Sequence, residues 1–337
     1  MGSCGSSSQG KHTAIVQPLQ ISEREKEKQE VEERFNSVLN KMSGDKIDWM
    51  LKRKDKFLDN YKVGMCIGRG TYGEVRVCLH IRTKNKRAVR ILNKKLMDEA
   101  TLNKFVTMTL LLQHLDHPNI LRFQEVFQDA KRFFIVTELC HGGDLLTQID
   151  DLIDSGSFMS EEDAGHIITQ VLSAVANLHK NEIIHMDLKP ENILFLSSTE
   201  SNVKLIDFHQ AQSTQGDGVV ELLKRPLPSA NLRNKALGTS YYIAPEVIDR
   251  NFNEKCDIWS IGCILYSMVT GCAAFDGADD DEILAKVKKG VYSIETLHDA
   301  NVSESCISFI MKLLTKDVNL RISAEEALQD PWIDECF

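Results

Sequence analysis

The stretch IIHMDLKPENILFLSSTESNVKLIDFHQ, residues 183–210, contains two short apolar runs separated by polar residues. The first run covers residues 193–196 and the second covers residues 203–206. Short apolar runs that are bounded by polar clusters predict two buried strands. Each predicted strand has polar residues at one end, where the strand would hold their side chains in place.

Two carboxylates and an amide occupy these strand ends. Asp187 and Asn192 precede the first predicted strand, and Asp207 directly follows the second. Carboxylate and amide oxygens are ligands for hard cations such as Mg²⁺, and a bound Mg²⁺ neutralises phosphate groups. The stretch therefore indicates a site for a metal ion and phosphate.

The composition indicates a globular, cytoplasmic protein. The chain has 337 residues, 42% of them hydrophobic, and its nine cysteines are scattered without a C-x-x-C pair, as in proteins of reducing compartments. No window has the roughly 18 uncharged apolar residues of a membrane span. The best candidate for a span, residues 261–275, is expected to be a buried helix and its end. The net charge of −9 argues against nucleic acid as the main partner.

The N-terminal residues MGSCGS fit the pattern for N-myristoylation, with Gly2 as the acceptor once Met1 is removed. Cys4 would carry a palmitate, and two lipids together give stable membrane anchoring. The alternative is an ordinary flexible terminus rich in Gly and Ser. The lipid interpretation predicts a cytoplasmic protein anchored to a membrane through its N-terminus.

Residues 1–60 are expected to form an N-terminal extension. Ser22 and Glu25 have the spacing of a capping box, and the apolar residues after them fall on one helical face. The stripe is short for a coiled coil, so we expect it to pack on the body of the protein. A second amphipathic stretch covers residues 47–58. The stripe consists of Val31, Phe35, Val38, Leu39 and Met42.

A glycine-rich motif follows the extension. Residues 67–75 read IGRGTYGEV, which places Gly68, Gly70, Gly73 and Val75 in the pattern G-x-G-x-x-G-x-V. A strand-like run follows the motif, which favours a glycine-rich hairpin over a dinucleotide-binding turn. Glycines in such a hairpin let backbone amides approach nucleotide phosphates. A glycine hairpin without a ligand is the alternative.

Further motifs follow in order: LDHPNI at 115–120, VTELCHGGDL at 136–145, HMDLKPENIL at 185–194, GTSYYIAPEV at 238–247 and CDIWSIGCIL at 256–265. With the glycine motif, they resemble the eukaryotic Ser/Thr protein kinase domain of the calcium/calmodulin type, and within it the calcium-dependent protein kinases. The resemblance extends from about residue 61 to residue 332. It implies an α+β fold with two lobes: a small antiparallel sheet in residues 61–138 and a mainly helical lobe in residues 139–337.

The resemblance implies ATP and Mg²⁺ as cofactors, and a protein substrate or docking partner of basic character. Asp187 would accept the proton of the substrate hydroxyl, and Lys189 would contact the γ-phosphate. Asn192 and Asp207 would hold the Mg²⁺ ion. Each of these residues is present in the sequence.

The resemblance also places an adenine ring between the lobes. Val75 and Ala88 would cover the ring from above and Leu194 from below, while Glu138 and Cys140 would offer backbone hydrogen bonds. Thr137 matches a small gatekeeper residue. The complete set assigned to nucleotide binding is Gly68, Gly70, Gly73, Val75, Ala88, Arg90, Thr137, Glu138, Cys140 and Leu194.

Other matches to the family are structural. Glu246 and Arg321 resemble an ion pair that braces the large lobe, and Asp257 resembles part of the helix that supports the catalytic loop. Asp144 and Glu191 lie where related kinases pair with a basic residue of the substrate. A solvated surface acid explains each of these two residues equally well.

Four positions depart from the family pattern. Arg90 replaces the lysine that contacts the α- and β-phosphates, and Met108 replaces the glutamate partner of that lysine. Arginine presents a planar fork instead of a compact ammonium, so the exchange is not conservative, and Asp207 is the expected partner of Arg90. Met186 replaces an arginine that usually binds a phosphorylated activation loop, and His209 replaces a glycine.

Three interpretations follow. The favoured one is a catalytically impaired kinase, or pseudokinase, that binds ATP–Mg and acts by docking partners. The alternative is an active Ser/Thr kinase in which Arg90 takes the place of the usual lysine, since the residues of the catalytic and metal-binding loops are retained. The third is a structural module without nucleotide, whose cleft would be occluded by apolar side chains or by Arg90.

We expect no EF-hand calcium site in this sequence. The acidic residues 276–281 are the calcium-like candidate, but they lack a glycine at the sixth loop position and a glutamate at the twelfth. The family resemblance makes them the start of a surface helix in the large lobe.

Overall fold

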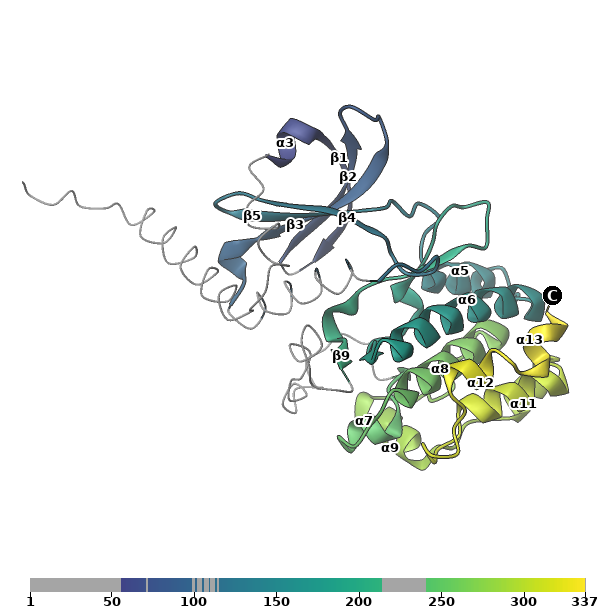
Figure 1. The fold of residues 1–337 in the computed structure, drawn as a ribbon. Coiled ribbons are helices and arrows are strands. Elements are labelled where there is room, and N and C mark those ends of the chain that lie inside the picture. Colours follow the sequence, from purple (N-terminus) through teal and green to yellow (C-terminus); the bar gives the residue numbers. More distant parts are fainter. Residues whose placement is uncertain are drawn as a thin grey trace, which may run out of the picture.

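The computed structural model describes residues 56–70, 72–98, 101, 105, 109, 113, 115–213 and 241–336. These residues form a lobe built on an antiparallel sheet and a second, mainly helical lobe (Figure 1). The predicted two-lobed α+β fold is therefore confirmed. Several predictions fall outside the described residues: the lipid acceptors Gly2 and Cys4, the helix expected after Ser22, and Met108.

The sheet has the strand order β1-β2-β3-β5-β4, and each neighbouring pair is antiparallel. A cluster of buried residues that includes Tyr61, Phe127 and Phe134 packs on the sheet and joins its strands. The strands are β1 (Tyr61–Gly70), β2 (Gly73–His80), β3 (Lys86–Asn93), β4 (Phe123–Gln128) and β5 (Arg132–Thr137), and the 3-10 turn η1 (Lys94–Leu96) follows β3.

A short helix, α3 (Phe57–Asn60), packs an aromatic ring on this sheet. The ring of Phe57 stacks on Phe134 at a centroid distance of 4.6 Å and on Tyr61 at 5.3 Å. Phe127 meets Phe57 edge to face, 5.6 Å away. Each aromatic pair adds about 0.5–1.5 kcal/mol beyond the burial of its surface. Residues just before the first strand thus belong to the packed lobe.

The helical lobe contains most of the buried apolar residues. Its helices are α5 (Leu145–Asp154), α6 (Glu161–Lys180), α7 (Pro245–Ile248), α8 (Lys255–Thr270), α9 (Asp280–Lys289), α10 (Glu295–Asp299), α11 (Glu304–Leu313), α12 (Ala324–Ala327) and α13 (Pro331–Glu335). Short strands and turns lie between them: β6 (Ile183–Ile184), η2 (Pro190–Asn192), β7 (Ile193–Phe195), β8 (Val203–Leu205), η3 (Phe208–Gln210) and β9 (Gln212–Ser213).

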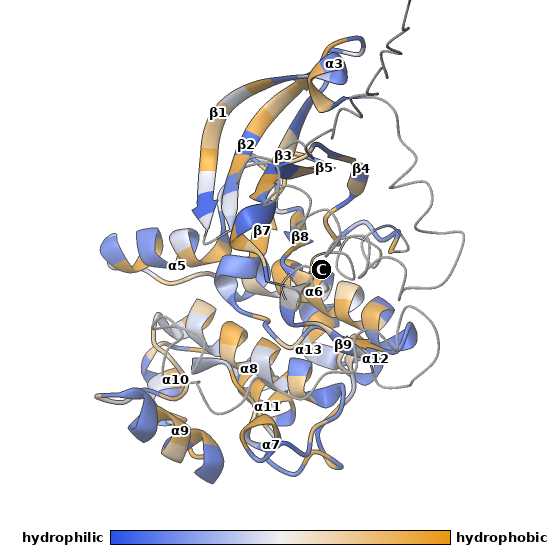
Figure 2. Ribbon diagram, turned by 90° about the vertical axis from the view of Figure 1, so that its left-hand side faces the viewer, coloured by the Kyte–Doolittle hydropathy of each residue, from blue (hydrophilic) through white to orange (hydrophobic). Residues whose placement is uncertain are grey.

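Helix α8 is the centre of the helical lobe. Nearly all of its residues are buried, and most of them are hydrophobic, as the hydropathy colouring of the ribbon indicates (Figure 2). A helix that is apolar on all sides is one that other helices surround. Gly271 ends it in the left-handed conformation, with φ 67°. The stretch 261–275 is thus the predicted buried helix and its end. Among the described residues, no helix has the length and apolar character to cross a membrane.

The two strands predicted from residues 183–210 are present as β7 and β8, which pair antiparallel. The acidic residues 276–281 begin a helix, as expected. Asp279 caps α9 by accepting a hydrogen bond from the backbone N–H of Glu282 at 2.9 Å. Capping uses the carboxylate to satisfy a free N–H of the first helical turn.

A buried ion pair braces the helical lobe. The guanidinium of Arg321 is fully buried and binds both carboxylate oxygens of Glu246. Arg321 also donates to the backbone carbonyls of Thr315 at 2.9 Å and Lys255 at 2.8 Å. These bonds replace the water that the guanidinium loses on burial, and they offset the cost of placing its charge in an apolar environment. The expected brace is thus present.

Replacing Arg321 with Met should lower the free energy of unfolding by roughly 3–5 kcal/mol, because Glu246 would remain buried without its partner. The matched control is Lys288→Met, which breaks the exposed pair of Lys288 with Asp249 at 2.8 Å. The control should cost less than about 1 kcal/mol. Denaturant unfolding of the three proteins measures the difference, and equal losses in the two variants would contradict the bracing role.

Candidate nucleotide and phosphotransfer site

A cavity of about 460 Å³ lies between the lobes. Its size is in the range of pockets that bind small ligands. The residues assigned to nucleotide binding from the sequence all line it: Gly68, Gly70, Gly73, Val75, Ala88, Arg90, Thr137, Glu138, Cys140 and Leu194, together with Asp207. Strands that are far apart in the chain therefore converge on one space.

The glycine-rich turn between β1 and β2 forms one wall of this cavity. A Cβ atom on Gly73 would collide with the carbonyl oxygen of Ile91, because β2 approaches β3 closely there. A Cβ atom on Gly70 would meet no atom within 4 Å. Gly73 is thus required by packing, whereas Gly70 borders open space that a ligand could enter.

The connection between the lobes offers polar backbone groups to the cavity. Among the described residues, the backbone N–H of Cys140 has no hydrogen-bond acceptor, and the Glu138 carbonyl accepts only the Thr137 hydroxyl, at 3.1 Å. Both groups can therefore bind the edge of a heterocycle. Burial, with a contribution from Glu138, raises the pKa of the Cys140 thiol to about 12, so the thiol is uncharged at neutral pH.

The side chain of Glu138 has a contact that the sequence did not predict. Its carboxylate forms an ion pair with the ammonium of Lys204 on β8, at 2.8 Å, and accepts a hydrogen bond from the backbone N–H of Arg122 at 2.6 Å. This ion pair joins the connection between the lobes to the helical lobe. The sequence did contain a signal for this ion pair: Lys204 lies inside the apolar run VKLI, and a charge buried in such a run needs a partner of opposite charge.

The catalytic-loop candidates form one hydrogen-bonded group. Asp187 is buried, and its carboxylate lies 3.3 Å from the ammonium of Lys189. The amide nitrogen of Asn192 donates to the backbone carbonyl of Asp187 at 2.7 Å and to its carboxylate at 3.2 Å. Because the amide nitrogen of Asn192 makes these bonds, its amide oxygen is the atom that could coordinate a cation. The structure thus brings Asp187, Lys189 and Asn192 together.

A buried histidine links this group to the end of β8. Nδ1 of His185 accepts a hydrogen bond from the backbone N–H of Asp187 at 3.3 Å, and Nε2 lies 3.0 Å from the carbonyl oxygen of Ile206. Both bonds form when the neutral ring carries its proton on Nε2. Burial lowers the pKa of His185, against the opposing charges of Asp257, Asp187 and Asp207.

Asp257, at the start of α8, supports the same loop. Its carboxylate is almost fully buried and accepts the backbone N–H groups of His185 at 2.8 Å and Met186 at 3.0 Å. It also contacts the ring of His179 at 3.0 Å. Met186 has a φ of 67°, which a non-glycine residue rarely adopts and which the bond to Asp257 stabilises. The structure confirms the expected supporting role of Asp257.

The cavity also contains the most important departure from the family pattern. The guanidinium of Arg90 on β3 lies 3.9 Å from the carboxylate of Asp207, and both side chains are partly exposed. Asp207 has a φ of 63° and directly precedes η3. The partner expected for Arg90 is thus the one found. The backbone of His209 lies in η3, but its side chain is outside the described residues.

Asn192 and Asp207 carry oxygen ligands of the type that Mg²⁺ prefers, and the backbone brings the two residues near each other. The backbone N–H of Ile206 donates to the Asn192 carbonyl at 2.9 Å, so Asp207 follows directly on a residue bonded to Asn192. The described residues hold no cluster of three or more His, Cys, Asp or Glu with metal-site spacing. Mg²⁺ commonly takes one or two protein ligands and completes its shell with water and phosphate.

Asp144 and Glu191, the two acids with alternative interpretations, have different environments. Asp144 caps α5 by accepting the backbone N–H of Thr147 at 2.8 Å and its hydroxyl at 3.0 Å. Glu191 has one buried carboxylate oxygen without a hydrogen-bond donor among the described residues. Capping accounts for Asp144 without a substrate.

This two-lobed fold with its interlobe site defines a protein kinase domain. The family model "Protein kinase domain" matches residues 61–333, and the chain belongs to this family. Members of the family normally use ATP and Mg²⁺.

Comparison with curated proteins narrows the resemblance to the calcium-dependent protein kinases. The chain is 35% identical to calcium-dependent protein kinase 5 of Plasmodium falciparum over 285 residues, which is 84% of this chain and 47% of that protein. It is 36% identical to calcium-dependent protein kinase 4 of Plasmodium berghei over 280 residues, 82% of this chain and 50% of the relative. The chain thus spans about half the length of these relatives.

The buried histidine predicts a pH dependence of stability. Because the pKa of His185 is lower in the folded protein than its ordinary value of 6.5, its contribution is complete above about pH 6.5 and is lost as the pH falls toward the folded value. His185→Gln should be less stable at pH 8 and should lose less stability between pH 7.5 and 5.5. Urea unfolding across this range measures both effects, with exposed His141→Gln as the control. Parallel pH profiles for the wild type and His185→Gln would contradict this prediction.

Proposed function

We propose that the chain binds ATP–Mg in the interlobe cavity, transfers phosphate poorly, and acts by docking partner proteins. One observation carries this proposal: the guanidinium of Arg90 lies 3.9 Å from Asp207, the residue that would hold the metal. Arg90 stands where the family has the lysine that contacts the phosphates. The cation at the family's phosphate-binding position is thus paired with the residue that would hold the metal.

Electrostatics explains why this arrangement would slow phosphoryl transfer. Two unit positive charges about 4 Å apart repel by roughly 4 kcal/mol at an effective dielectric constant of 20. A divalent ion at Asp207 would therefore have to displace the guanidinium. Losing one oriented charge contact in the transition state commonly costs about 10²–10³ in rate. Binding of nucleotide itself depends mainly on the apolar and hinge contacts and would persist.

The alternative function is an active Ser/Thr kinase. The hydrogen-bonded group of Asp187, Lys189 and Asn192 favours it, because these residues are where substrate activation and phosphate contact would occur. Arg90 is 40% exposed, so its side chain has room to turn from Asp207 toward a phosphate. In this function Asp187 accepts the hydroxyl proton and Mg²⁺ supplies charge neutralisation when bound. A module with an occluded cleft is disfavoured by the open cavity.

The exchange of Arg90 for Gln distinguishes these functions. If Arg90 competes with Mg²⁺, the variant should increase the Mg²⁺ enhancement of ATP affinity by about tenfold. If Arg90 clamps the phosphates, the variant should bind ATP–Mg more weakly instead. Calorimetric titration with ATP, with and without Mg²⁺, measures both quantities. Arg82→Gln, in the exposed turn after β2, is the control.

A phosphotransfer assay on a basic peptide completes the comparison. The proposal expects a wild-type rate within about threefold of an Asp187→Asn control, with measurable ATP binding. Robust transfer that disappears in Asp187→Asn would instead establish the active kinase. Failure of ATP to bind in any condition would leave the structural module.

We also propose membrane attachment through lipids on Gly2 and Cys4, which rests on the N-terminal sequence. In cells that carry out N-myristoylation, Gly2→Ala should move the protein from the membrane fraction to the soluble fraction. Mass spectrometry of the N-terminal peptide tests the modification directly. An unmodified Gly2 in that peptide would rule the proposal out.

A further inference from the structure

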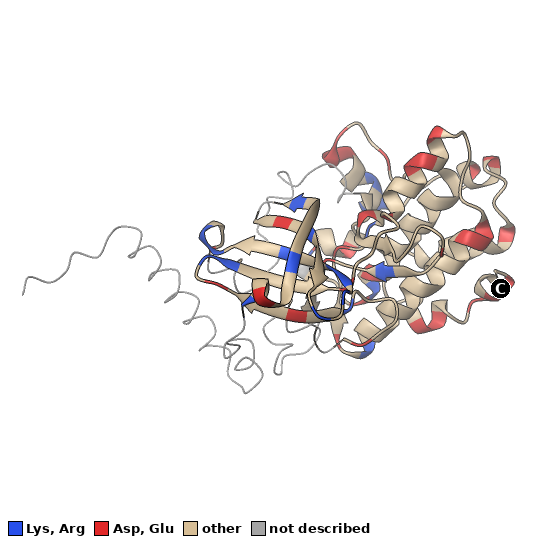
Figure 3. Cartoon of the chain, turned by 90° about the horizontal axis from the view of Figure 1, so that it is seen from above, with Lys and Arg blue, Asp and Glu red and all other residues tan. Residues whose placement is uncertain are grey.

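Positive charge is concentrated in the sheet lobe. Residues 56–97, which contain α3, β1, β2, β3 and η1, include eleven Lys or Arg and two Asp or Glu. The whole chain has the opposite balance, with 40 Lys or Arg against 49 Asp or Glu. In Figure 3, Lys and Arg (blue) are frequent on the sheet lobe, whereas Asp and Glu (red) are frequent on the helical lobe. A strong charge asymmetry between two parts of a chain indicates an anionic partner for the basic part.

Six of these cations gather at one end of the sheet, where α3 meets the turn between β2 and β3. The backbone N–H of Ile81, in this turn, donates to the carbonyl of Asn60 in α3 at 2.8 Å. The strand register places Lys62 of β1 and Lys86 of β3 on either side of Leu79 of β2. We call this part of the sheet lobe the basic end, and its cations are Lys56, Lys62, Arg82, Lys84, Lys86 and Arg87.

The six cations of the basic end have no carboxylate partner among the described residues. None of them belongs to an ion pair, and the guanidinium of Arg87 donates to the backbone carbonyl of Lys86 at 3.3 Å. Five of the six are exposed, and Arg87 is half-buried. The segments that form the basic end, residues 56–63 and 78–87, contain one carboxylate, that of Asp59. The described chain therefore leaves most of this positive charge without a counter-charge.

Apolar side chains are exposed next to these cations. Leu58 in α3 is 61% exposed, and Val63 on β1 is 40% exposed. Their neighbours Phe57 and Tyr61 are buried in the aromatic cluster, so the packing of the sheet lobe does not depend on the two exposed residues. Cations beside exposed apolar side chains are typical of surfaces that lie at a lipid headgroup boundary.

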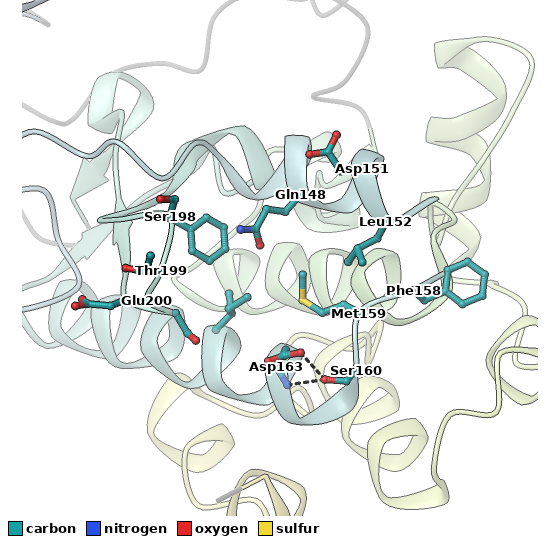
Figure 4. A pocket seen from close by; sticks show the side chains of 13 residues that line it. Gln148, Asp151, Leu152, Phe158, Met159, Ser160, Asp163, Ser198, Thr199 and Glu200 are labelled. Carbon is teal, nitrogen blue, oxygen red and sulfur yellow. Dashed lines mark hydrogen bonds between the residues drawn. The ribbon is translucent and has the colours of Figure 1, made fainter. Parts of the chain in front are cut away.

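One face of the helical lobe has the opposite character. A hollow of about 570 Å³ on this lobe is bordered by Asp151, Asp163 and Glu200, and Figure 4 shows these carboxylates around the opening. Among the described residues, no Lys, Arg or His lines this hollow. An anionic surface that attracts the basic end would repel this face, and the two effects together would orient the molecule.

We propose that the basic end of the sheet lobe docks on an anionic membrane surface. Its lysine and arginine side chains pair with the charged lipid headgroups, while Leu58 and Val63 enter the headgroup boundary. These exposed apolar side chains favour a lipid surface over a nucleic acid, which would engage the cations alone. In Figure 1, α3 lies on the side of the sheet lobe away from the helical lobe. Docking by this end therefore keeps the helical lobe away from the membrane.

This inference goes beyond the proposed function, because it requires neither the nucleotide site nor a lipid on Gly2 or Cys4. A single acyl chain gives only marginal membrane binding, and a basic surface is one of the second signals that make anchoring stable. The two membrane proposals fail separately. Mass spectrometry of the N-terminal peptide tests the lipids, whereas vesicle binding by the unmodified chain tests the basic end.

The test uses the full-length chain produced without acyl groups, and vesicles of phosphatidylcholine with or without about 30% phosphatidylserine. The wild type should sediment with the anionic vesicles, less so as the salt concentration rises, and should not sediment with the neutral ones. The triple variant Arg82→Gln, Lys84→Gln, Lys86→Gln should bind about tenfold more weakly or worse, because each cation near an anionic surface adds to the attraction. Leu58→Ser should weaken binding about threefold.

The matched control is the triple variant Lys180→Gln, Lys289→Gln, Lys316→Gln, which removes the same charge at exposed positions of the helical lobe. Leu320→Ser, at a residue that is 74% exposed on that lobe, is the control for Leu58→Ser. Both controls should bind the vesicles like the wild type, and all variants should bind ATP equally.

Two results would overturn the proposal: no binding to anionic vesicles at low salt, or equal losses in the two triple variants. Binding of a single-stranded RNA by the wild type, without binding to vesicles, would replace the membrane with a nucleic acid.

Discussion

The carboxylate of Asp257 lies almost fully buried at the start of α8 and holds the loop that contains Asp187. A buried carboxylate is stable only when hydrogen bonds replace the water it has lost. Here the donors come from the backbone of His185 and Met186, and the ring of His179 on α6 lies against the oxygen that accepts the hydrogen bond from His185. The charge therefore fixes the loop to two central helices. It also offsets the backbone strain at Met186, a conformation that costs on the order of 1–3 kcal/mol.

This constraint extends to the end of β8, which Asp207 follows closely. The ring of His185 bonds to the carbonyl of Ile206, and the N–H of Ile206 bonds to Asn192. Asp187 and Asn192 thus occupy positions set by the helical lobe alone. The sheet lobe contributes Arg90, whose contact with Asp207 is long and partly exposed. The site consequently has one half that several hydrogen bonds hold in place and one half whose cation makes a single long contact.

Strand β7 places two different surfaces back to back. Its alternation directs Leu194 to the interlobe cavity and Phe195 to the opposite side, beside residues of α5 and α6. The ion pair of Glu138 with Lys204, on the neighbouring strand β8, ties the connection between the lobes to the same small sheet. A short pair of strands thus supports both the interlobe cavity and the connection between the lobes.

The amino-acid sequence by itself determined the strands β7 and β8 and the buried helix α8, because local patterns of apolar residues specify these elements. The two-lobed fold followed from the resemblance of the ordered motifs to a known family. Ordered motifs also identified the residues that line the interlobe cavity and the pairing of Arg90 with Asp207. Tertiary structure alone decided the Glu138–Lys204 ion pair and the role of His185. In each case the partners are far apart in the chain, and their contact depends on how helices and strands pack, which local periodicity does not encode.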